Sequence, residues 1–229
     1  MTDENTHAHE ESRDGDHSHE KSHSHDTQPG HSHEQSHDHS GEAHAHDDHH
    51  HHDADSVAVA VVTVSSSRDI EADPSGEYIV TAFEDAGHEV TVRELVPDEY
   101  DSVQGTVDRL ARRKDTDVVV TTGGTGVTPD DVTPEAVRGL FAKRLPGFGE
   151  LFRRLSYEEI GTSTIGSRAT AGVILTTPVF CLPGSKNAVR LGVDEIILSE
   201  VGHLVGLARR GMSDETDENA ENDHDTSAE

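Results

Sequence analysis

The stretch from Val57 to Val64 constrains the fold of this chain more than any other segment. It is a continuous run of β-branched and other apolar residues, and the polar loop from Ser65 to Arg68 follows directly. A strand without polar alternation is buried on both faces, and such strands belong to parallel sheets that helices cover. The run therefore predicts a central strand of an α/β protein.

Helical and strand patterns alternate along the chain after this run. Asp73 and Pro74 are typical of the N-cap and first position of a helix, and Gly87 is typical of a helix end. Together they predict a helix over about 74–86. The further elements expected are strand 88–95, helix 101–113, strand 118–121, a helix from Thr133, a helix around 148–155, strands 173–176 and 179–182, and a long helix after Ser185. Short connections between such elements predict a three-layer, open, mostly parallel, Rossmann-like α/β sheet with helices on both faces.

Composition divides the chain into three parts. Residues 1–55 contain 16 of the 19 histidines, 15 acids and 2 bases, and residues 212–229 contain 8 acids and no base. Segments so poor in apolar residues cannot form a packed core, so both are predicted to be disordered tails. Residues 56–211 have an ordinary apolar content and the size of one domain.

The same composition excludes several classes of protein. No apolar run approaches the roughly 18–20 residues that span a bilayer, and the N-terminus lacks the pattern of a signal peptide. We therefore expect a cytoplasmic protein without a membrane partner. A net charge of −28 argues against nucleic acid as a partner, because phosphate backbones require clustered Lys and Arg. One cysteine, Cys181, excludes an intrachain disulfide framework and a zinc site built from cysteines.

The acid excess also bears on the environment of the protein. Only 4 lysines accompany 14 arginines, and there are 46 acids in all. At about 1 M salt the Debye length falls to roughly 3 Å, so repulsion among carboxylates is weak there. The composition favours a halophilic protein. The alternative is an acidic protein that its two tails keep soluble.

The histidines of the first tail occur in repeated His-Xaa-His units with carboxylates between them. They run from His7 to His52 and end in four consecutive histidines. Neutral imidazole is a good ligand for Zn, Ni, Co and Cu, so we predict that His7–His52 binds a transition metal. Incidental binding by a solvated tail is the alternative, because the spacing defines no tetrahedral site.

Polar and glycine-rich loops follow the expected strands at their carboxyl ends, where ligands bind on sheets of this kind. The loop from Gly123 to Gly126 (Gly-Gly-Thr-Gly) offers bare backbone N–H groups, which suit phosphate. It is not a Walker A loop, because no Gly-Lys-Ser/Thr follows and the nearest downstream lysine is Lys143. It is not the dinucleotide fingerprint either, because Pro129 stands where the third glycine belongs. A purely structural turn is the alternative.

Three aspartates lie near this loop in the predicted sheet. Asp130 and Asp131 follow it directly, and Asp98 lies in the loop after the second strand. Mg²⁺ prefers one or two carboxylates together with substrate phosphate oxygens, so these residues are candidate magnesium ligands. The alternative for Asp130 and Asp131 is capping of the helix that begins near Thr133. Glycines and carboxylates without a P-loop lysine favour nucleotidyl or phosphoryl transfer.

Four motifs occur in an order that resembles a known family. They are Thr121–Gly126, Asp131–Ala136, Pro146–Glu150 and Leu182–Ser185. Together they are similar to the molybdenum cofactor biosynthesis family typified by MoaB and MogA, over essentially all of residues 56–211. The stretch Phe148–Gly172 resembles the MoaB branch more than MogA. A loop like Gly126–Asp131 also occurs in competence-damage-type nucleotide hydrolases, but the later motifs favour MoaB.

The resemblance implies an enzyme that transfers an adenylyl group from Mg-ATP to molybdopterin and releases pyrophosphate. It implies that Asp98 and Asp131 are catalytic and hold Mg²⁺, whereas Asp130 is a candidate ligand only from its position beside the glycine loop. The residues implied to bind the substrates are Ser65, Arg68, Gly123, Gly124, Thr125, Gly126, Glu150, Pro183, Gly184 and Ser185, with Glu150 at the pterin. This chain departs from the family at Ser66, where an Asp is usual.

The resemblance further implies a homo-oligomer, either a trimer or a hexamer, and handover of the product to a molybdenum insertion protein. Two alternatives stay open. One is a molybdopterin-binding protein without catalysis, and the other is a metal-delivery protein that acts through the His-rich tail. Removal of residues 1–55 distinguishes a metal-delivery protein from an enzyme, because catalysis would survive the deletion whereas the capacity to bind transition metals would be lost.

Overall fold

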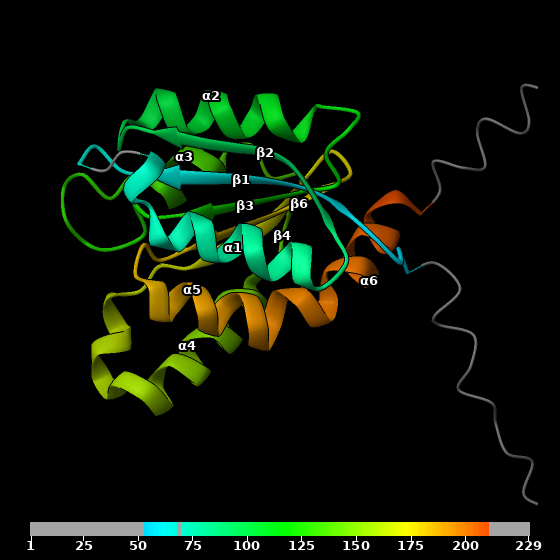
Figure 1. Ribbon diagram of the computed structural model, residues 1–229. Coiled ribbons are helices and arrows are strands. Elements are labelled where there is room, and N and C mark those ends of the chain that lie inside the picture. Colours follow the sequence, from blue (N-terminus) through cyan, green and yellow to red (C-terminus); the bar gives the residue numbers. More distant parts are fainter. Residues whose placement is uncertain (1–52, 68–69, 211–229) are drawn as a thin grey trace, which may run out of the picture. The chain divides into compact units, whose positions relative to one another are not determined.

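The computed structural model describes residues 53–67 and 70–210. The stretch His7–His52, Arg68, the tail 212–229 and nearly all of the predicted tail 1–55 lie outside these residues. The described chain forms a six-stranded sheet in the order β2-β1-β3-β6-β5-β4 (Figure 1). The strands are β1 (Ala58–Val64), β2 (Glu89–Val96), β3 (Val118–Thr122), β4 (Lys143–Arg144), β5 (Thr170–Ile174) and β6 (Thr177–Leu182).

Neighbouring strands β2, β1, β3 and β6 run parallel, whereas β5 is antiparallel to β6 and β4 is antiparallel to β5. The helices are α1 (Pro74–Asp85), α2 (Tyr100–Ala111), α3 (Thr133–Arg138), α4 (Pro146–Ile160), α5 (Lys186–Gly192) and α6 (Leu198–Arg209). Two short 3₁₀ helices, Ile70–Ala72 and Gly161–Gly166, and a π-helical turn, Val193–Ile197, complete the described elements. No helix among them is long and apolar enough to cross a membrane.

The helices cover both faces of the sheet, as predicted. Helices α2 and α3 pack on one face, and α1, α4, α5 and α6 pack on the other (Figure 1). Side chains of β1 alternate between these two cores. Val59 and Val61 pack with the first core, and Ala60 and Val62 with the second. All four are fully buried, which explains why β1 shows no polar alternation.

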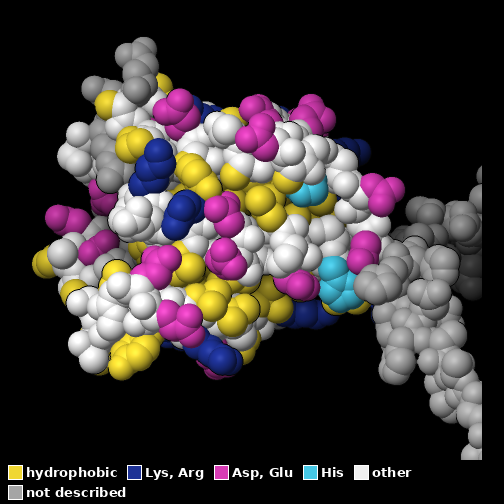
Figure 2. Space-filling model, turned by 60° about the horizontal axis from the view of Figure 1, so that its bottom comes forward, with side chains coloured by type: hydrophobic (Ala, Val, Ile, Leu, Met, Phe, Trp, Pro, Cys, Tyr) yellow, Lys and Arg dark blue, Asp and Glu magenta, His cyan; other side chains and the backbone are white. Residues whose placement is uncertain are grey.

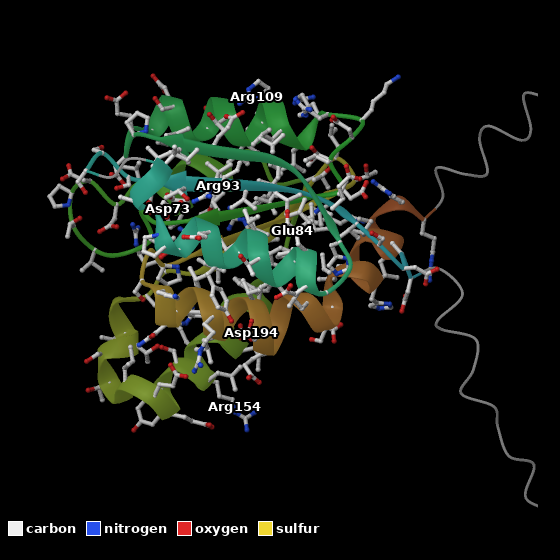
Figure 3. All side chains as sticks on the ribbon, in the orientation of Figure 1. Asp73, Glu84, Arg93, Arg109, Arg154 and Asp194 are labelled. Atoms are coloured by element: carbon white, nitrogen blue, oxygen red, sulfur yellow. The ribbon has the colours of Figure 1, made fainter. Side chains whose placement is uncertain are left out.

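A buried carboxylate fixes the start of α1. Asp73 is the predicted N-cap, and its Oδ1 accepts the N–H of Gly76 at 3.0 Å. Its Oδ2 accepts the hydroxyl of Thr63 at 2.5 Å and lies 3.5 Å from a guanidinium nitrogen of Arg93 on β2 (Figure 3). The hydroxyl of Ser75 then donates to the carbonyl of Gly184 at 2.9 Å. Helix α1 is thereby tied to β1, β2 and the loop after β6.

Three details differ from the sequence-based expectation. The strand expected over 173–176 lies at Thr170–Ile174, and residues 175–176 form the turn that connects it to β6. The helix expected after Ser185 is divided into α5 and α6 by the π-helical turn Val193–Ile197. The sequence pattern does not predict strand β4, because both of its residues are exposed and carry no apolar signal. It pairs with β5 at Gly172, where an added Cβ would lie 2.4 Å from the ring of Phe141. Glycine therefore allows this ring to pack directly against β5.

Candidate active site

The loops that follow β1, β2, β3 and β6 meet at the carboxyl edge of the parallel strands. They enclose a cavity of about 320 Å³. Its lining residues are Val64, Ser65, Ser67, Asp98, Gly123, Gly124, Thr125, Gly126, Asp131, Pro183 and Gly184. Both aspartates predicted to be catalytic line this cavity, together with seven of the ten residues predicted to bind the substrates.

Two glycines of the loop have backbone conformations that favour glycine. Gly123 has a φ of 105° and Gly124 a φ of 64°. An added Cβ would lie 2.2 Å from the carbonyl oxygen of Val64 at the first position and 2.4 Å from the hydroxyl of Thr133 at the second. That hydroxyl donates to the Gly123 carbonyl at 2.9 Å, and the Thr133 N–H donates to the Gly124 carbonyl at 3.0 Å. The start of α3 therefore holds the glycine turn in place.

Thr125 presents a buried polar atom in the wall of the cavity. The residue is 1% exposed, and its Oγ1 has no hydrogen-bond partner among the described residues. Buried hydroxyls are normally hydrogen-bonded, and an exception indicates a place for a ligand or an ordered water. The Thr125 hydroxyl and the adjacent glycine turn therefore fit a guest with oxygen acceptors, such as a phosphate.

Asp131 is fixed by contacts within its own loop. Its Oδ2 accepts the backbone N–H of Thr128 at 2.8 Å and the Thr128 hydroxyl at 2.6 Å. Burial alone would raise the pKa of the Asp131 carboxyl. Hydrogen bonds from Thr128 and from the N–H of Gly126, with the charge of Arg168, outweigh burial and hold that pKa below its ordinary value. Asp131 is therefore ionised at neutral pH.

The capping alternative for Asp130 and Asp131 is wrong. The N-cap residue of α3 is Val132, and no side chain of the described residues caps this helix. The carboxylate of Asp131 bonds to Thr128 instead, which closes the turn before the helix. Asp130 is exposed and is not among the residues that line the cavity. The two neighbouring aspartates thus differ, and Asp130 stays a predicted magnesium ligand only.

Ser66, where the family usually has Asp, joins two loops of the site. Its N–H donates to Oδ2 of Asp98 at 2.6 Å, and its Oγ accepts the N–H of Asp98 at 3.0 Å. The other carboxylate oxygen, Oδ1, has no hydrogen-bond partner within the described ranges. The serine therefore positions Asp98 at the cavity and adds no charge of its own.

Arg168 is a residue of this site to which the sequence assigns no role. Its guanidinium donates to the carbonyls of Gly126 at 2.6 Å and Asp131 at 2.7 Å and forms an ion pair with Glu135. Its backbone N–H donates to the carbonyl of Thr125 at 3.0 Å. Arg168, in the segment before β5, thereby holds both ends of the glycine loop. The one sequence signal is its place in a motif typical of the MoaB branch.

Two of the residues predicted to bind the substrates, Ser185 and Glu150, also lie outside the 320 Å³ cavity. Ser185 caps α5 by accepting the N–H of Ala188 at 3.3 Å, and it lines an adjacent cavity of about 200 Å³ that Thr125 and Gly126 also line. Glu150 lines a third cavity, of about 450 Å³, in which several arginines gather. The predicted contact of Glu150 with a pterin stays a prediction.

Comparison with known proteins gives consistent matches. Residues 60–203 match the family model described as a probable molybdopterin binding domain. Molybdenum cofactor biosynthesis protein B of Bacillus subtilis is 47% identical over 147 residues, which cover 64% of this chain and 86% of that protein. The protein of the same name from Escherichia coli K12 is 43% identical over 137 residues, covering 60% of this chain and 81% of its relative.

Solved structures extend the likeness to the fold. A crystal structure of molybdenum cofactor biosynthesis protein B is 46% identical, with a TM-score of 0.66 and coverage of 68% of this chain and 97% of that one. The tungsten cofactor synthesizing protein MoaB from Pyrococcus furiosus is 41% identical, with a TM-score of 0.61 and coverage of 68% and 98%. A MogA structure is 27% identical, with a TM-score of 0.59 and coverage of 65% and 99%. The chain therefore belongs to the family of molybdopterin-binding domains typified by MoaB and MogA, and to its MoaB branch.

Proposed function

We propose that this chain is a molybdopterin adenylyltransferase that uses Mg-ATP. Membership of the family supports a role in molybdenum cofactor biosynthesis. The observation that supports adenylyl transfer in particular is the cavity lined by both the glycine turn Gly123–Gly126 and the two carboxylates of Asp98 and Asp131. A phosphate-binding turn beside two carboxylates is an arrangement suited to joining two phosphate groups.

The glycine turn binds the phosphates in this proposal. Its backbone approaches a ligand without side chains in the way, and the unpartnered Thr125 hydroxyl adds a donor from the described part of the chain. Thr133 and Arg168 already bind carbonyls of the turn, which fixes the orientation of its peptide groups. The turn is thus organised before a ligand arrives.

Asp98 and Asp131 are the residues that would hold magnesium. Each uses its Oδ2 to accept a backbone N–H, which fixes the carboxylate in place. No cluster of three or more potential metal-ligating side chains occurs in residues 53–67 and 70–210. Two carboxylates completed by phosphate oxygens match the usual coordination of Mg²⁺. The bound ion would supply positive charge between the two phosphates that must meet.

In the proposed reaction, an oxygen of the molybdopterin phosphate forms a bond to the α-phosphorus of ATP. The bond from that phosphorus to the oxygen bridging to the β-phosphate breaks, and pyrophosphate leaves with the electron pair. No side chain forms a covalent bond. The contribution of the chain is to orient both phosphates through the turn and to keep Asp131 ionised through Thr128.

The direct test is pyrophosphate release by the purified full chain with molybdopterin and Mg-ATP in high salt. We expect release that requires both substrates and magnesium. Deletion of residues 1–55 serves as a control for the tail, because catalysis by the cavity does not need the histidines. Tight molybdopterin binding without pyrophosphate release would overturn the enzymatic proposal and leave a binding protein.

The family resemblance also leads us to expect a trimer or hexamer, with product handed to a molybdenum insertion protein. Light scattering of the full chain in concentrated salt checks the assembly. A stable monomer under those conditions would contradict this expectation.

A further inference from the structure

The cavity of about 450 Å³ that contains Glu150 has a wall rich in arginine. Four arginines line it, from the end of α3, from β4, from α4 and from the segment before β5: Arg138, Arg144, Arg153 and Arg168. Residues 56–211 carry 23 acids and 16 bases, so this cluster of positive charge contrasts with the net negative charge of the domain. Like charges gathered in one cavity repel one another unless an anion compensates them.

Most of this positive charge has no acidic partner. Arg168 forms an ion pair with Glu135, but Arg138, Arg144 and Arg153 form none within 4 Å among the described residues. Arg153 donates only a long hydrogen bond, 3.4 Å, to the carbonyl of Ala169. Three such arginines against the one carboxylate of Glu150 leave an excess of two positive charges in the wall.

The N-terminus of α4 faces the same cavity. Pro146 and Gly149 of its first turn line the wall. Pro146 has no N–H, and the Phe148 N–H already donates to the Leu145 carbonyl at 3.2 Å, so this helix end contributes the field of its dipole rather than free backbone donors. An added Cβ at Gly149 would lie 2.6 Å from the Ala169 carbonyl and 2.9 Å from Nη1 of Arg153. Glycine therefore lets the Arg153 guanidinium lie against the positive end of a 15-residue helix.

We propose that this cavity is a second anion site, which binds a phosphate group carrying two negative charges. A guanidinium group can donate two parallel hydrogen bonds to the oxygens of one phosphate, and several guanidinium groups line this cavity. The glycine turn lines a different cavity, the one of 320 Å³, and Arg168 contacts both the turn and the proposed anion site. Arg138, Arg144 and Arg153 have no part in the proposed adenylyl transfer, so anion binding can be tested without that reaction, although Glu150, the predicted pterin contact, lines the same cavity.

Calorimetric titration of the full chain tests the site. EDTA is present to exclude magnesium-dependent binding, at the lowest salt that keeps the chain folded. Separate titrations use inorganic phosphate, pyrophosphate and glycerol phosphate, and their order of affinity distinguishes a free anion from an organic monoester as the preferred ligand. We expect Arg144→Gln and Arg153→Gln each to weaken binding of the preferred anion by about tenfold or more.

Arg154→Gln is the matched control. This residue neighbours Arg153 on α4 but is exposed and does not line the cavity (Figure 3). We expect its titration to match that of the unaltered chain. Equal binding by all three variants would overturn the proposal. Loss of oligomers in Arg144→Gln with unchanged anion binding would also overturn it, and would assign the cavity to an interface between copies.

A second measurement requires no variant. Phenylglyoxal modifies accessible arginines, and peptide mass spectrometry maps the modified positions. The preferred anion is expected to protect Arg138 and Arg144 and to leave Arg154 reactive. Equal reactivity of all three with and without the anion would contradict a phosphate site here, whatever the outcome of the adenylyl transfer assay.

Discussion

Asp98 and Asp117 make nearly the same backbone contact at opposite edges of the sheet. At the amino edge, Oδ2 of Asp117 accepts the N–H of Ala58 at 2.8 Å, and the Asp117 N–H donates to the Ala58 carbonyl at 2.7 Å. At the carboxyl edge, Oδ2 of Asp98 accepts the N–H of Ser66 at 2.6 Å, and the Asp98 N–H donates to the Ser66 hydroxyl. The two aspartates differ in the other carboxylate oxygen.

That remaining oxygen separates a structural carboxylate from a candidate functional one. Oδ1 of Asp117 forms an ion pair with Arg209 of α6, which ties the last helix to the start of β3. Oδ1 of Asp98 has no hydrogen-bond partner in the described part of the chain, and Asp98 lines a cavity. The local backbone geometry alone therefore does not identify a functional aspartate. The two residues are distinguished by whether another side chain already compensates the carboxylate charge.

The largest effect is expected from removing charge at the carboxyl edge. Asp131→Asn and Asp98→Asn preserve the shape of the side chain, and α3 should form normally because the Asp131 carboxylate does not cap it. Loss of a preorganised electrostatic contact costs about 10²–10³ in turnover, so we predict a fall of that order in pyrophosphate release for each. Asp130→Asn, at an exposed position, should lose less. Steady-state pyrophosphate assays at saturating Mg-ATP measure these rates.

Asp108→Asn is the control for a general loss of surface charge. Asp108 lies on α2, where it pairs with Arg112. We expect normal turnover from this variant. Full activity of Asp131→Asn with an unchanged magnesium requirement would remove the proposed distinction between the two edges.

A stability effect without a catalytic one is expected at the amino edge. Asp117→Ala removes the acceptor for the Ala58 N–H and the partner of Arg209, and hydrogen bonds to charged groups contribute about 2 kcal/mol. We predict destabilisation of that order in denaturant unfolding, with unchanged turnover per folded molecule. Normal stability, or turnover lost as strongly as in Asp98→Asn, would contradict the comparison.

Salt is expected to act on the whole acidic surface. Acidic side chains are spread over the face that carries α4 and α5 (Figure 2). Dilution from about 1 M to about 0.1 M salt lengthens the Debye length from roughly 3 to 10 Å. If the acid excess is a halophilic adaptation, we expect this dilution to lower the melting temperature by a few degrees. That change corresponds to a loss of roughly 1 kcal/mol in the free energy of unfolding. The ion pair between Asp117 and Arg209 is screened less in dilute salt, so on its own it would raise the melting temperature. A higher melting temperature in dilute salt would therefore reject the halophilic interpretation.

The smallest effect concerns pH, and it differs between the two edges. His88 precedes β2 at the amino edge, and burial lowers its pKa below 6.5. The unfolded chain then binds a proton more readily, so stability is lost as pH falls below about 6.5. The lowered pKa of Asp131 acts in another window, since its contribution is lost only as pH falls below the ordinary aspartate pKa of about 3.9. Melting curves from pH 7.5 to 5 should show a slope that His88→Gln reduces, and an equal slope in this variant would contradict the assignment to His88.

The fold was largely predictable because its central strands are buried on both faces. An unbroken apolar run such as β1 permits few alternatives, and Pro74 after Asp73 marks the start of α1. Strand β4 was not predictable in this way. Its two residues, Lys143 and Arg144, are exposed and owe their conformation to pairing with β5, which sequence periodicity does not record.

The placement of the loops around the candidate site was predictable, and the contacts within it were less so. Sheet topology brings Asp98 and the glycine turn together, as expected. The capping role considered for Asp131 failed because Thr128, three residues earlier, offers both an N–H and a hydroxyl to the same oxygen. The role of Arg168 was not predictable because its guanidinium bonds to backbone carbonyls about forty residues away in sequence, and carbonyls are the same at every position.

The contact between Gly123 and Gly184 has a consequence for the thermodynamics of ligand binding. An added Cβ at Gly184 would lie 3.2 Å from the Cα of Gly123, and the Gly123 N–H donates to the Leu182 carbonyl at 3.0 Å. The turns after β3 and β6 are therefore packed backbone to backbone. Glycine segments lose the most conformational entropy on ordering, and here that loss accompanies folding of the sheet. A ligand entering the cavity meets a wall that is already ordered, so its affinity is not reduced by the entropy of arranging the glycines.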